Sequence, residues 1–230
     1  MRKHKTRTTV QFLPWLVCSV LFFPSIATAA GPKLPADALP VPLVRQTSDY
    51  SCGPAVLVAL LRYFNAYEGP ETKLHRLLGT SAEQGTLPEA LAKGAQRFGL
   101  RASVEQPMTL AQLQSSLRAG RPVIIELQAW RDPKSRQKSW LDTWDDGHYV
   151  VLIGMDNQYA YFMDPSTPET YTFLSLPELL FRWHDVNPQR GVRGQHDYHL
   201  GVVIFPPTDP RNLRGISARS PRMQRLIKLD

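Results

Sequence analysis

The sequence predicts an α+β fold in which a central helix near the N-terminus packs on a largely antiparallel sheet. Helical patterns gather in the first half of the chain and strand patterns in the second, and the strands follow one another with connections of hairpin length. A doubly wound parallel sheet would instead alternate strands and helices along the chain. The 230 residues, 43% of them hydrophobic, suffice for one sizeable domain.

The central helix is predicted to begin at Ser51 or Cys52, because Pro54 suits a first helical turn and apolar residues then recur at helical spacing. A short helix is expected around residues 73–78. Capping boxes, in which a hydroxyl residue precedes Glu or Gln by three positions, predict three more helices. These boxes are Thr86–Glu89, Thr109–Gln112 and Ser175–Glu178.

The strands are predicted from runs rich in β-branched and aromatic residues. These runs are 122–129, 148–154, 159–163, 170–174 and 199–205. Between the first two runs lies a long polar segment, 130–147, which contains Trp130, Trp140 and Trp144. Long loops of this kind often cover a functional site, and an ordinary surface insertion is the alternative.

The first 29 residues have the pattern of a secretory signal peptide. Four basic residues and no acid precede an apolar stretch, and Ala27-Thr28-Ala29 matches the small-x-small cleavage pattern. The apolar stretch is short for a membrane span of about 20 residues. We therefore expect an exported protein, periplasmic or secreted, which is anchored in the membrane if the signal is not cleaved.

Three segments follow residues 1–29. Residues 30–40 form a proline-rich, extended lead-in, residues 41–205 the folded domain, and residues 206–230 a basic tail that we expect to be solvated and partly disordered. The formal net charge is +7, but the signal and the tail contribute +4 each, so the folded domain carries about −1. This distribution of charge argues against nucleic-acid binding by the folded domain. We expect the protein to be monomeric. Membrane association through the tail or an uncleaved signal stays open.

Cys52 is the cysteine that remains once the signal is removed, and it lies where the predicted central helix begins. The positive end of a helix dipole favours the thiolate, which is the reactive form. Exported proteins usually keep cysteines in disulfide pairs, so a single cysteine needs another explanation. Cys52 is therefore the candidate nucleophile, and a small buried hydrophobic residue is the alternative.

Three other residues could complete a thiol active site. His148 opens a predicted strand and could accept the Cys52 proton. Asp164 ends the next strand, one hairpin away, and could orient the imidazole. Gln46 precedes Cys52 by six residues, and its amide could hold an oxyanion together with the Cys52 N–H. Each also has an ordinary explanation: a surface histidine, an Asp-Pro turn and a solvated glutamine.

His184, His196 and His199 lie near aspartates and could be drawn as metal ligands. Their spacing is loose, and no further cysteine or carboxylate cluster in the sequence supports a metal site. The sequence also contains no glycine-rich phosphate-binding loop. We therefore predict no metal and no cofactor.

In combination, the active-site candidates resemble the C39 family of papain-like cysteine peptidases. Residues 46–54 (QTSDYSCGP) resemble the active-site segment of that family, and residues 147–152 (GHYVVL) its histidine segment. Asp164-Pro165 matches its Asp-Pro at the expected spacing. The resemblance covers roughly residues 41–185.

The resemblance implies a papain-like fold and a cysteine peptidase acting on a peptide or protein. Cys52 would attack, His148 would act as base and then acid, Asp164 would orient His148, and Gln46 would stabilise the oxyanion. The best-known members cut leader peptides after a double glycine and are fused to a membrane-spanning exporter, whereas this sequence has no Walker motif and has Ser51 where an acid often precedes the cysteine. Two alternatives stay open: an acyl transferase of the transglutaminase or amidase type, and an inactive binding module.

Overall fold

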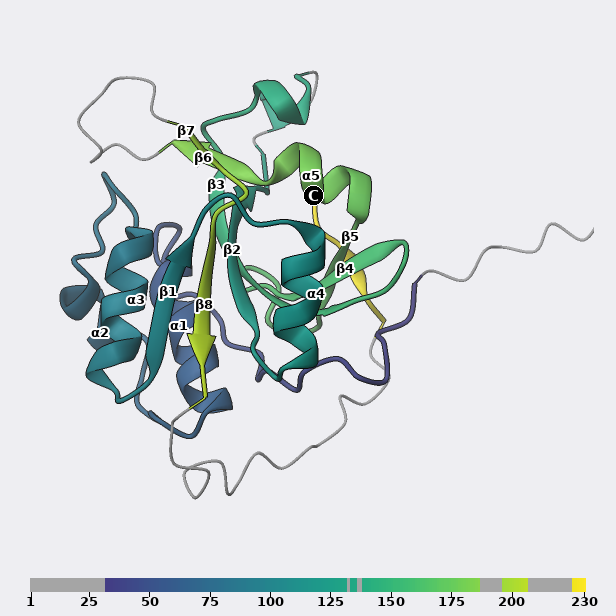
Figure 1. The fold of residues 1–230 in the computed structure, drawn as a ribbon. Coiled ribbons are helices and arrows are strands. Elements are labelled where there is room, and N and C mark those ends of the chain that lie inside the picture. Colours follow the sequence, from purple (N-terminus) through teal and green to yellow (C-terminus); the bar gives the residue numbers. More distant parts are fainter. Residues whose placement is uncertain (1–31, 132, 136–137, 187–195, 207–224) are drawn as a thin grey trace, which may run out of the picture. The chain divides into compact units, whose positions relative to one another are not determined.

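The structure is a computed structural model that describes residues 32–131, 133–135, 138–186, 196–206 and 225–230. The strands of its main sheet are β1 (Arg101–Glu105), β2 (Val123–Gln128), β3 (Gly147–Met155), β4 (Tyr159–Met163), β5 (Thr172–Ser175), β8 (Gly201–Phe205) and β9 (Ile227–Lys228). Within the described residues they form one sheet in the order β1-β8-β2-β3-β4-β5-β9 (Figure 1). All neighbouring strands are antiparallel except β5 and β9, which are parallel.

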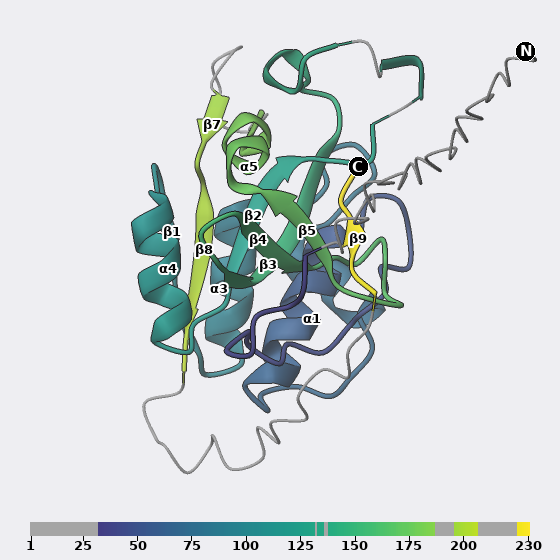
Figure 2. The same cartoon turned by 90° about the vertical axis from the view of Figure 1, so that its right-hand side faces the viewer.

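The sheet is covered by helices on both faces. The helices are α1 (Cys52–Tyr63), α2 (Thr72–Leu78), α3 (Pro88–Arg97), α4 (Leu110–Arg118) and α5 (Leu176–Arg182). Helices α1, α2 and α3 lie on one side of the sheet, and α4 and α5 lie on the other (Figures 1 and 2). The predicted α+β fold, with a central helix packed on a largely antiparallel sheet, is confirmed.

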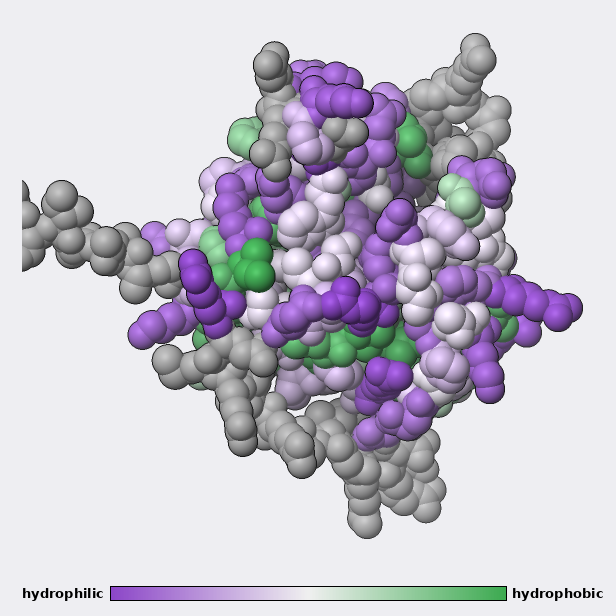
Figure 3. All heavy atoms as spheres, turned by 180° about the vertical axis from the view of Figure 1, so that it is seen from behind, coloured by the Kyte–Doolittle hydropathy of each residue, from purple (hydrophilic) through white to green (hydrophobic). Residues whose placement is uncertain are grey.

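Alternation along the strands divides the apolar residues between two cores. In β3, Val151 and Ile153 pack with α1, whereas Val150 and Leu152 pack with residues of α4 and α5. Because both faces are covered, this strand is apolar along most of its length. Every residue of α1 except Arg62 is buried. The surface seen from behind is mostly hydrophilic, with small hydrophobic patches among polar side chains (Figure 3).

The helix caps follow the predictions in part. Thr109 and Gln112 form the predicted capping box, and the Ser175 hydroxyl accepts the Glu178 N–H at 3.3 Å. The box at Thr86 is wrong, because α3 begins at Pro88 and is capped by Leu87 without a side-chain hydrogen bond. The Thr86 hydroxyl bonds instead to the Thr80 hydroxyl at 2.7 Å.

Four strands were not predicted: β1, β9 and the two strands of a small separate sheet, β6 (His184–Val186) and β7 (His196–Tyr198). Strand β9 joins β5, and Leu229 beyond it is fully buried. Residues 225–230 of the predicted basic tail therefore have a defined place beside the sheet. The predicted signal segment and residues 207–224 lie outside the described residues.

The described part of the lead-in segment contains a turn, closed by the Ala38 N–H on the Pro35 carbonyl at 3.1 Å, and then contacts the sheet. The Leu39 N–H donates to the Ile153 carbonyl at 2.8 Å, and the Val41 carbonyl accepts the Tyr171 hydroxyl at 2.8 Å. These bonds tie the N-terminal part of the described chain to the sheet. In the part of the chain that the structure describes, we find no helix with the length and apolar character needed to cross a bilayer.

Candidate active site

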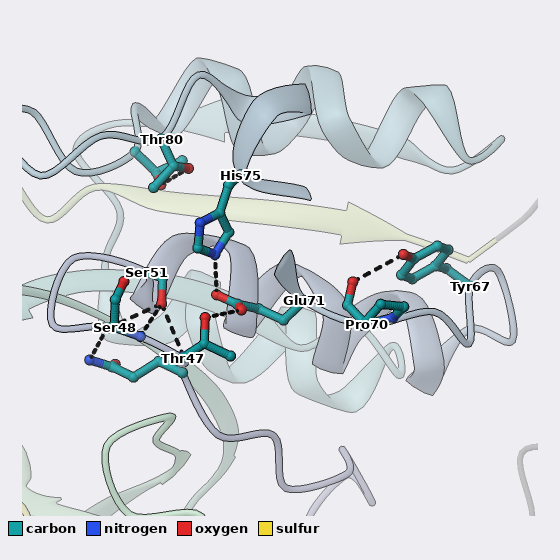
Figure 4. Close-up of polar contacts among 10 residues, drawn as sticks. Thr47, Ser48, Ser51, Tyr67, Pro70, Glu71, His75 and Thr80 are labelled. Carbon is teal, nitrogen blue, oxygen red and sulfur yellow. Dashed lines mark hydrogen bonds and ion pairs between the residues drawn. The ribbon is translucent and has the colours of Figure 1, made fainter. Parts of the chain in front are cut away.

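The segment that leads into α1 is folded by the Ser51 side chain, which is fully buried. The Ser51 hydroxyl accepts the backbone N–H groups of Thr47 at 3.1 Å and Ser48 at 2.9 Å (Figure 4). It makes no capping bond to α1. Ser51 therefore closes the loop that precedes Cys52 and does not cap the helix.

Helix α2 anchors this loop through Glu71, a residue that sequence reasoning did not single out. The Glu71 carboxylate accepts the Thr47 hydroxyl at 2.5 Å and lies 2.7 Å from His75 Nε2 (Figure 4). The Glu71 side chain is 4% exposed, so these partners replace most of its hydration. No local sequence pattern links Glu71 to Thr47, because the contact joins two separate elements.

Cys52 is the first residue of α1 and is 8% exposed. The first N–H groups of a helix have no partner within it, so the thiol lies at the positive end of the helix. The next residue must be small, because a Cβ on Gly53 would come within 2.5 Å of Thr86. This close packing fixes the start of α1 against the segment before α3 and explains why Thr86 is not a cap.

His148, at the start of β3, connects Cys52 to Asp164. Its Nε2 atom lies 2.9 Å from Asp164 Oδ1, the His148 and Cys52 side chains line the same cavity, and their interaction contributes to the raised pKa of the His148 ring. Because Nε2 is held by Asp164, Nδ1 is the ring nitrogen left for the thiol. The structure thus brings together three residues that are far apart in the sequence, and a cysteine beside an oriented imidazole can act as a nucleophile.

Asp164 follows β4 and is fully buried with three hydrogen-bond donors around it. Besides His148, the Ser166 N–H donates to Oδ1 at 2.8 Å and the Trp130 indole N–H donates to Oδ2 at 3.1 Å. Trp130 adopts a φ of 59°, which bulky residues rarely adopt, and its backbone N–H donates to the carbonyl oxygen of Asp230. Trp130 is therefore a second side chain that orients the carboxylate.

The charges of this cluster favour a protonated imidazole. Burial lowers the pKa of His148, but the charge and hydrogen bond of Asp164, followed by the interaction with Cys52, raise it to about 10. An imidazolium at neutral pH would stabilise a thiolate on Cys52 by charge attraction. The three side chains are thus suited to a thiolate–imidazolium pair.

Gln46 lies beside this cluster, but the side chain is held within its own loop. Its backbone N–H donates to the Pro165 carbonyl at 3.1 Å. Its amide donates to the Ser48 carbonyl at 3.0 Å and accepts the Ser166 hydroxyl at 3.3 Å. Gln46 therefore contacts the turn that carries Asp164, and it does not line the cavity that contains Cys52.

A cavity of about 320 Å³ opens beside Cys52 and His148. Its other walls come from the segment before α1, the segment before α3, strand β2, the Trp-containing segment and strand β6. Glu126 on β2 and Asp185 on β6 line the cavity and were not candidates in the sequence. Nothing in the sequence indicates that these two carboxyls meet.

The histidines weighed as metal ligands have other partners. The His196 ring stacks on Trp144 with 3.9 Å between centroids, and the His199 ring stacks on Trp183 at 4.8 Å. His184 Nε2 lies 2.8 Å from the Thr143 carbonyl. No group of three or more metal-ligating side chains is found within the described ranges.

The tryptophans of the 130–147 segment have separate contacts. Trp140 lies between the guanidinium groups of Arg131 and Arg182, which are 3.3 and 3.5 Å from its ring centroid. Trp144 packs on the ring of His196 and lines the cavity beside Cys52. Together with Trp130, these contacts attach the segment to the body of the protein next to the candidate site.

Solved structures similar to this chain are peptidase domains. The peptidase domain of Streptococcus ComA, a bifunctional ABC transporter of a quorum-sensing pathway, matches with a TM-score of 0.51 and 19% identity over 72% of this chain and 98% of that domain. A putative C39-like peptidase from Bacillus anthracis matches with a TM-score of 0.52 and 18% identity over 72% of this chain and 94% of that chain. At these identities the matches show that the fold is shared.

Sequence relatives and a family model add to this. An uncharacterised protein of Methanothermobacter thermautotrophicus is 31% identical over 124 residues, which are 54% of this chain and 71% of that protein. An uncharacterised protein of Methanothermobacter marburgensis is 29% identical over the same shares. The model of the Peptidase_C39 like family matches residues 38–187, more than half of the sequence. The chain therefore belongs to the Peptidase_C39 like family and has its papain-like peptidase fold.

Proposed function

We propose that this protein is an exported cysteine peptidase that cleaves peptide bonds in a peptide or protein. The observation that carries the proposal is the position of His148, which is hydrogen-bonded to Asp164 and lines the same cavity as Cys52. Membership of the peptidase family supports the same conclusion. The signal-like first 29 residues motivate the proposal of export.

In the first step, the Cys52 thiolate attacks the carbonyl carbon of the scissile peptide bond. The new C–S bond forms while the carbonyl π electrons move onto oxygen, which gives a tetrahedral oxyanion. The oxyanion then collapses and the C–N bond breaks. The His148 Nδ1 proton passes to the departing amine, which leaves a thioester on Cys52 and a neutral imidazole.

In the second step, water hydrolyses the thioester. His148 takes a proton from the water, the hydroxide adds to the acyl carbon, and the C–S bond breaks to restore the thiolate and the imidazolium. Asp164 keeps the imidazole in one orientation throughout, as the third member of a triad does. Its three hydrogen bonds allow it to stay in place while the charge of His148 changes.

We assign the oxyanion to the backbone N–H of Cys52 and the side-chain amide of Gln46. The Cys52 N–H is among the first N–H groups of α1, which have no partner within the helix. Gln46 Nε2 carries two hydrogens, and the bond to Ser48 uses one of them. The second hydrogen is the donor that we assign to the substrate oxygen.

The test is cleavage of a mixed peptide library by the full chain, analysed by mass spectrometry. The proposal expects new termini to appear with wild-type protein and none with Cys52→Ala, while both proteins show the same thermal unfolding. Amine incorporation into glutamine-containing peptides without cleavage would indicate a transferase instead. Absence of cleavage and transfer, with a Cys52 thiol no more reactive than free cysteine, would indicate a binding module.

A further inference from the structure

We propose that the cavity beside Cys52 selects peptides with a positively charged side chain, arginine or lysine, next to the scissile bond, and that Glu126 and Asp185 bind this charge. The proposal deepens the peptidase function and rests on it for the identity of the ligand. The substrate-binding cavity is identified by Cys52 and His148, which both line it, and this identification does not depend on the two carboxyls.

The lining of the cavity is acidic. Five carboxyl residues face it, and the described lining contains no lysine or arginine. The five are Asp49, Glu83, Glu126, Asp145 and Asp185. Since the folded domain as a whole carries a net charge of only about −1, the negative charge is concentrated where a substrate would bind. A cavity lined by one sign of charge attracts ligands of the opposite sign.

Two of these carboxyls belong to the wall of the cavity: Glu126 is buried and Asp185 is half-buried. Glu126 is 8% exposed and stands opposite Tyr149 in the pairing of β2 with β3. Asp185 lies over Gly147, so closely that a Cβ on Gly147 would come 2.2 Å from Asp185 Oδ2. Gln128 donates to Asp185 Oδ1 at 3.0 Å. The absence of a side chain on Gly147 thus allows Asp185 to reach the cavity next to His148.

Without a cation beside them, the surroundings of the pair disfavour the ionised forms of both carboxyls. Burial and the charge of Asp185 raise the pKa of Glu126 well above its usual range; a hydrogen bond with Tyr149 opposes this, and Asp197 and Cys52 add to the rise. Burial also raises the pKa of Asp185 to about 6, against hydrogen bonds from the Val186 N–H, Gln128 and Glu126, while the charge of Asp197 adds to the rise. A guanidinium or ammonium group would supply the missing positive charge.

An aromatic residue at the same cavity fits such a ligand. Tyr50 is exposed and lines the cavity, and a cation over an aromatic face gains additional attraction. The long apolar stem of arginine or lysine suits contact with this ring while the charged end reaches the carboxyls. The volume of the cavity, about 320 Å³, is at the lower end of the range of small-molecule sites, which is consistent with one side chain and the adjoining backbone.

The experiment measures binding separately from cleavage by using Cys52→Ala protein of full length. Fluorescent peptides carry a single arginine at one of the positions around a central bond, each paired with a peptide that has neutral citrulline at that position. Fluorescence anisotropy is expected to show arginine binding roughly 10- to 100-fold more tightly than citrulline at one position, the range of a charge-assisted hydrogen bond. The preference should weaken below about pH 6, where Asp185 takes up a proton.

Variants in the same background locate the charge. Glu126→Gln and Asp185→Asn are each expected to reduce the arginine-to-citrulline ratio by roughly tenfold. Glu68→Gln, an exposed carboxyl outside the cavity, is the matched control and should leave the ratio unchanged. If either variant fails to fold, the arginine and citrulline peptides can still be compared on Cys52→Ala protein that retains Glu126 and Asp185, so the test stays valid.

The outcomes separate this inference from the peptidase function. Equal binding of arginine and citrulline peptides at every position, or an unchanged ratio in both folded variants, overturns the inference. Cleavage by wild-type protein without any preference for a basic residue also overturns it while leaving the peptidase intact. Preferential arginine binding by Cys52→Ala, without cleavage by wild type, supports the cationic site and contradicts the peptidase.

Discussion

Asp164 and the pair Glu126–Asp185 both lie near the candidate nucleophile, and they have opposite environments. Asp164 is fully buried but accepts hydrogen bonds from three donors, so its negative charge is compensated and raises the pKa of His148. Glu126 is buried and Asp185 is half-buried, and burial raises the pKa of both carboxyls. The comparison teaches that the donors around a buried carboxyl, more than its burial, decide its chemical role.

The largest expected effect is on the Asp164 side. Asp164→Asn removes the charge that keeps His148 protonated and the acceptor that orients its ring, so the rate of peptide cleavage should fall roughly 10²- to 10⁴-fold. Steady-state kinetics on a cleaved peptide measure this. Asp142→Asn, which makes the same substitution at an exposed carboxyl, is the control. A variant with more than half of the wild-type rate would contradict the role of Asp164.

Gln46 belongs to the same side, because its loop is bonded to the turn after Asp164. Gln46→Ala removes one oxyanion donor and should reduce kcat by roughly 100- to 1000-fold with little change in thermal stability. Unchanged turnover in a folded variant would remove Gln46 from the mechanism. A loss of stability without a change in kcat would assign Gln46 to the loop alone.

Trp130 tests whether the number of donors on Asp164 matters. Trp130→Phe deletes the indole N–H bond at 3.1 Å and retains a large aromatic ring, so cleavage should slow by roughly tenfold. Trp140→Phe in the same segment is the matched control, since Trp140 stacks between two arginines and does not bond Asp164. If both variants slow cleavage equally, the effect comes from the segment and not from the donor.

The smallest expected effect is on the stability of the folded protein. Substitution of Glu126 should increase this stability, whereas the substitutions above reduce activity. Because the folded-state pKa of Glu126 is raised above its usual 4.5, folding is disfavoured as pH rises above that value. Glu126→Gln removes this penalty and should raise the free energy of unfolding at pH 8 by on the order of 1 kcal/mol. Urea unfolding at pH 4 and pH 8 checks it: the difference from wild type should vanish at the lower pH. Destabilisation at pH 8 would mean that Glu126 is ionised and paired.

The central elements of the fold could be predicted because their signals are local. The apolar spacing after Cys52 gave α1, and the continuous apolar run after His148 gave β3, since a strand covered on both faces is apolar throughout. The capping box at Thr109 was also sufficient. At Thr86 the same pattern failed because contact with Gly53 of another helix engages that residue.

The elements that were missed depend on contacts between distant segments. Strand β9 contains two residues, and its pairing with β5 and the burial of Leu229 stabilise it. Strand β1 is an exception, because Ala102 and Val104 alternate with polar residues and pack against the core, so a short period-two signal was present in the sequence. In the candidate site, Cys52, His148, Asp164 and Gln46 could be chosen from sequence by their residue types and order. Trp130, Glu126 and Asp185 could not, because their roles arise from tertiary neighbours.

The proposed mechanism depends most directly on a protonated His148 that favours the thiolate form of Cys52, and alkylation of Cys52 by iodoacetamide tests this pair. Because the pKa of His148 is raised to about 10, the alkylation rate of wild-type protein should fall less steeply with decreasing pH than that of a free thiol, which slows roughly tenfold for each unit below its pKa near 8.5. His148→Ala should restore the steep dependence of a free thiol. A wild-type profile as steep as that of free cysteine would contradict the account.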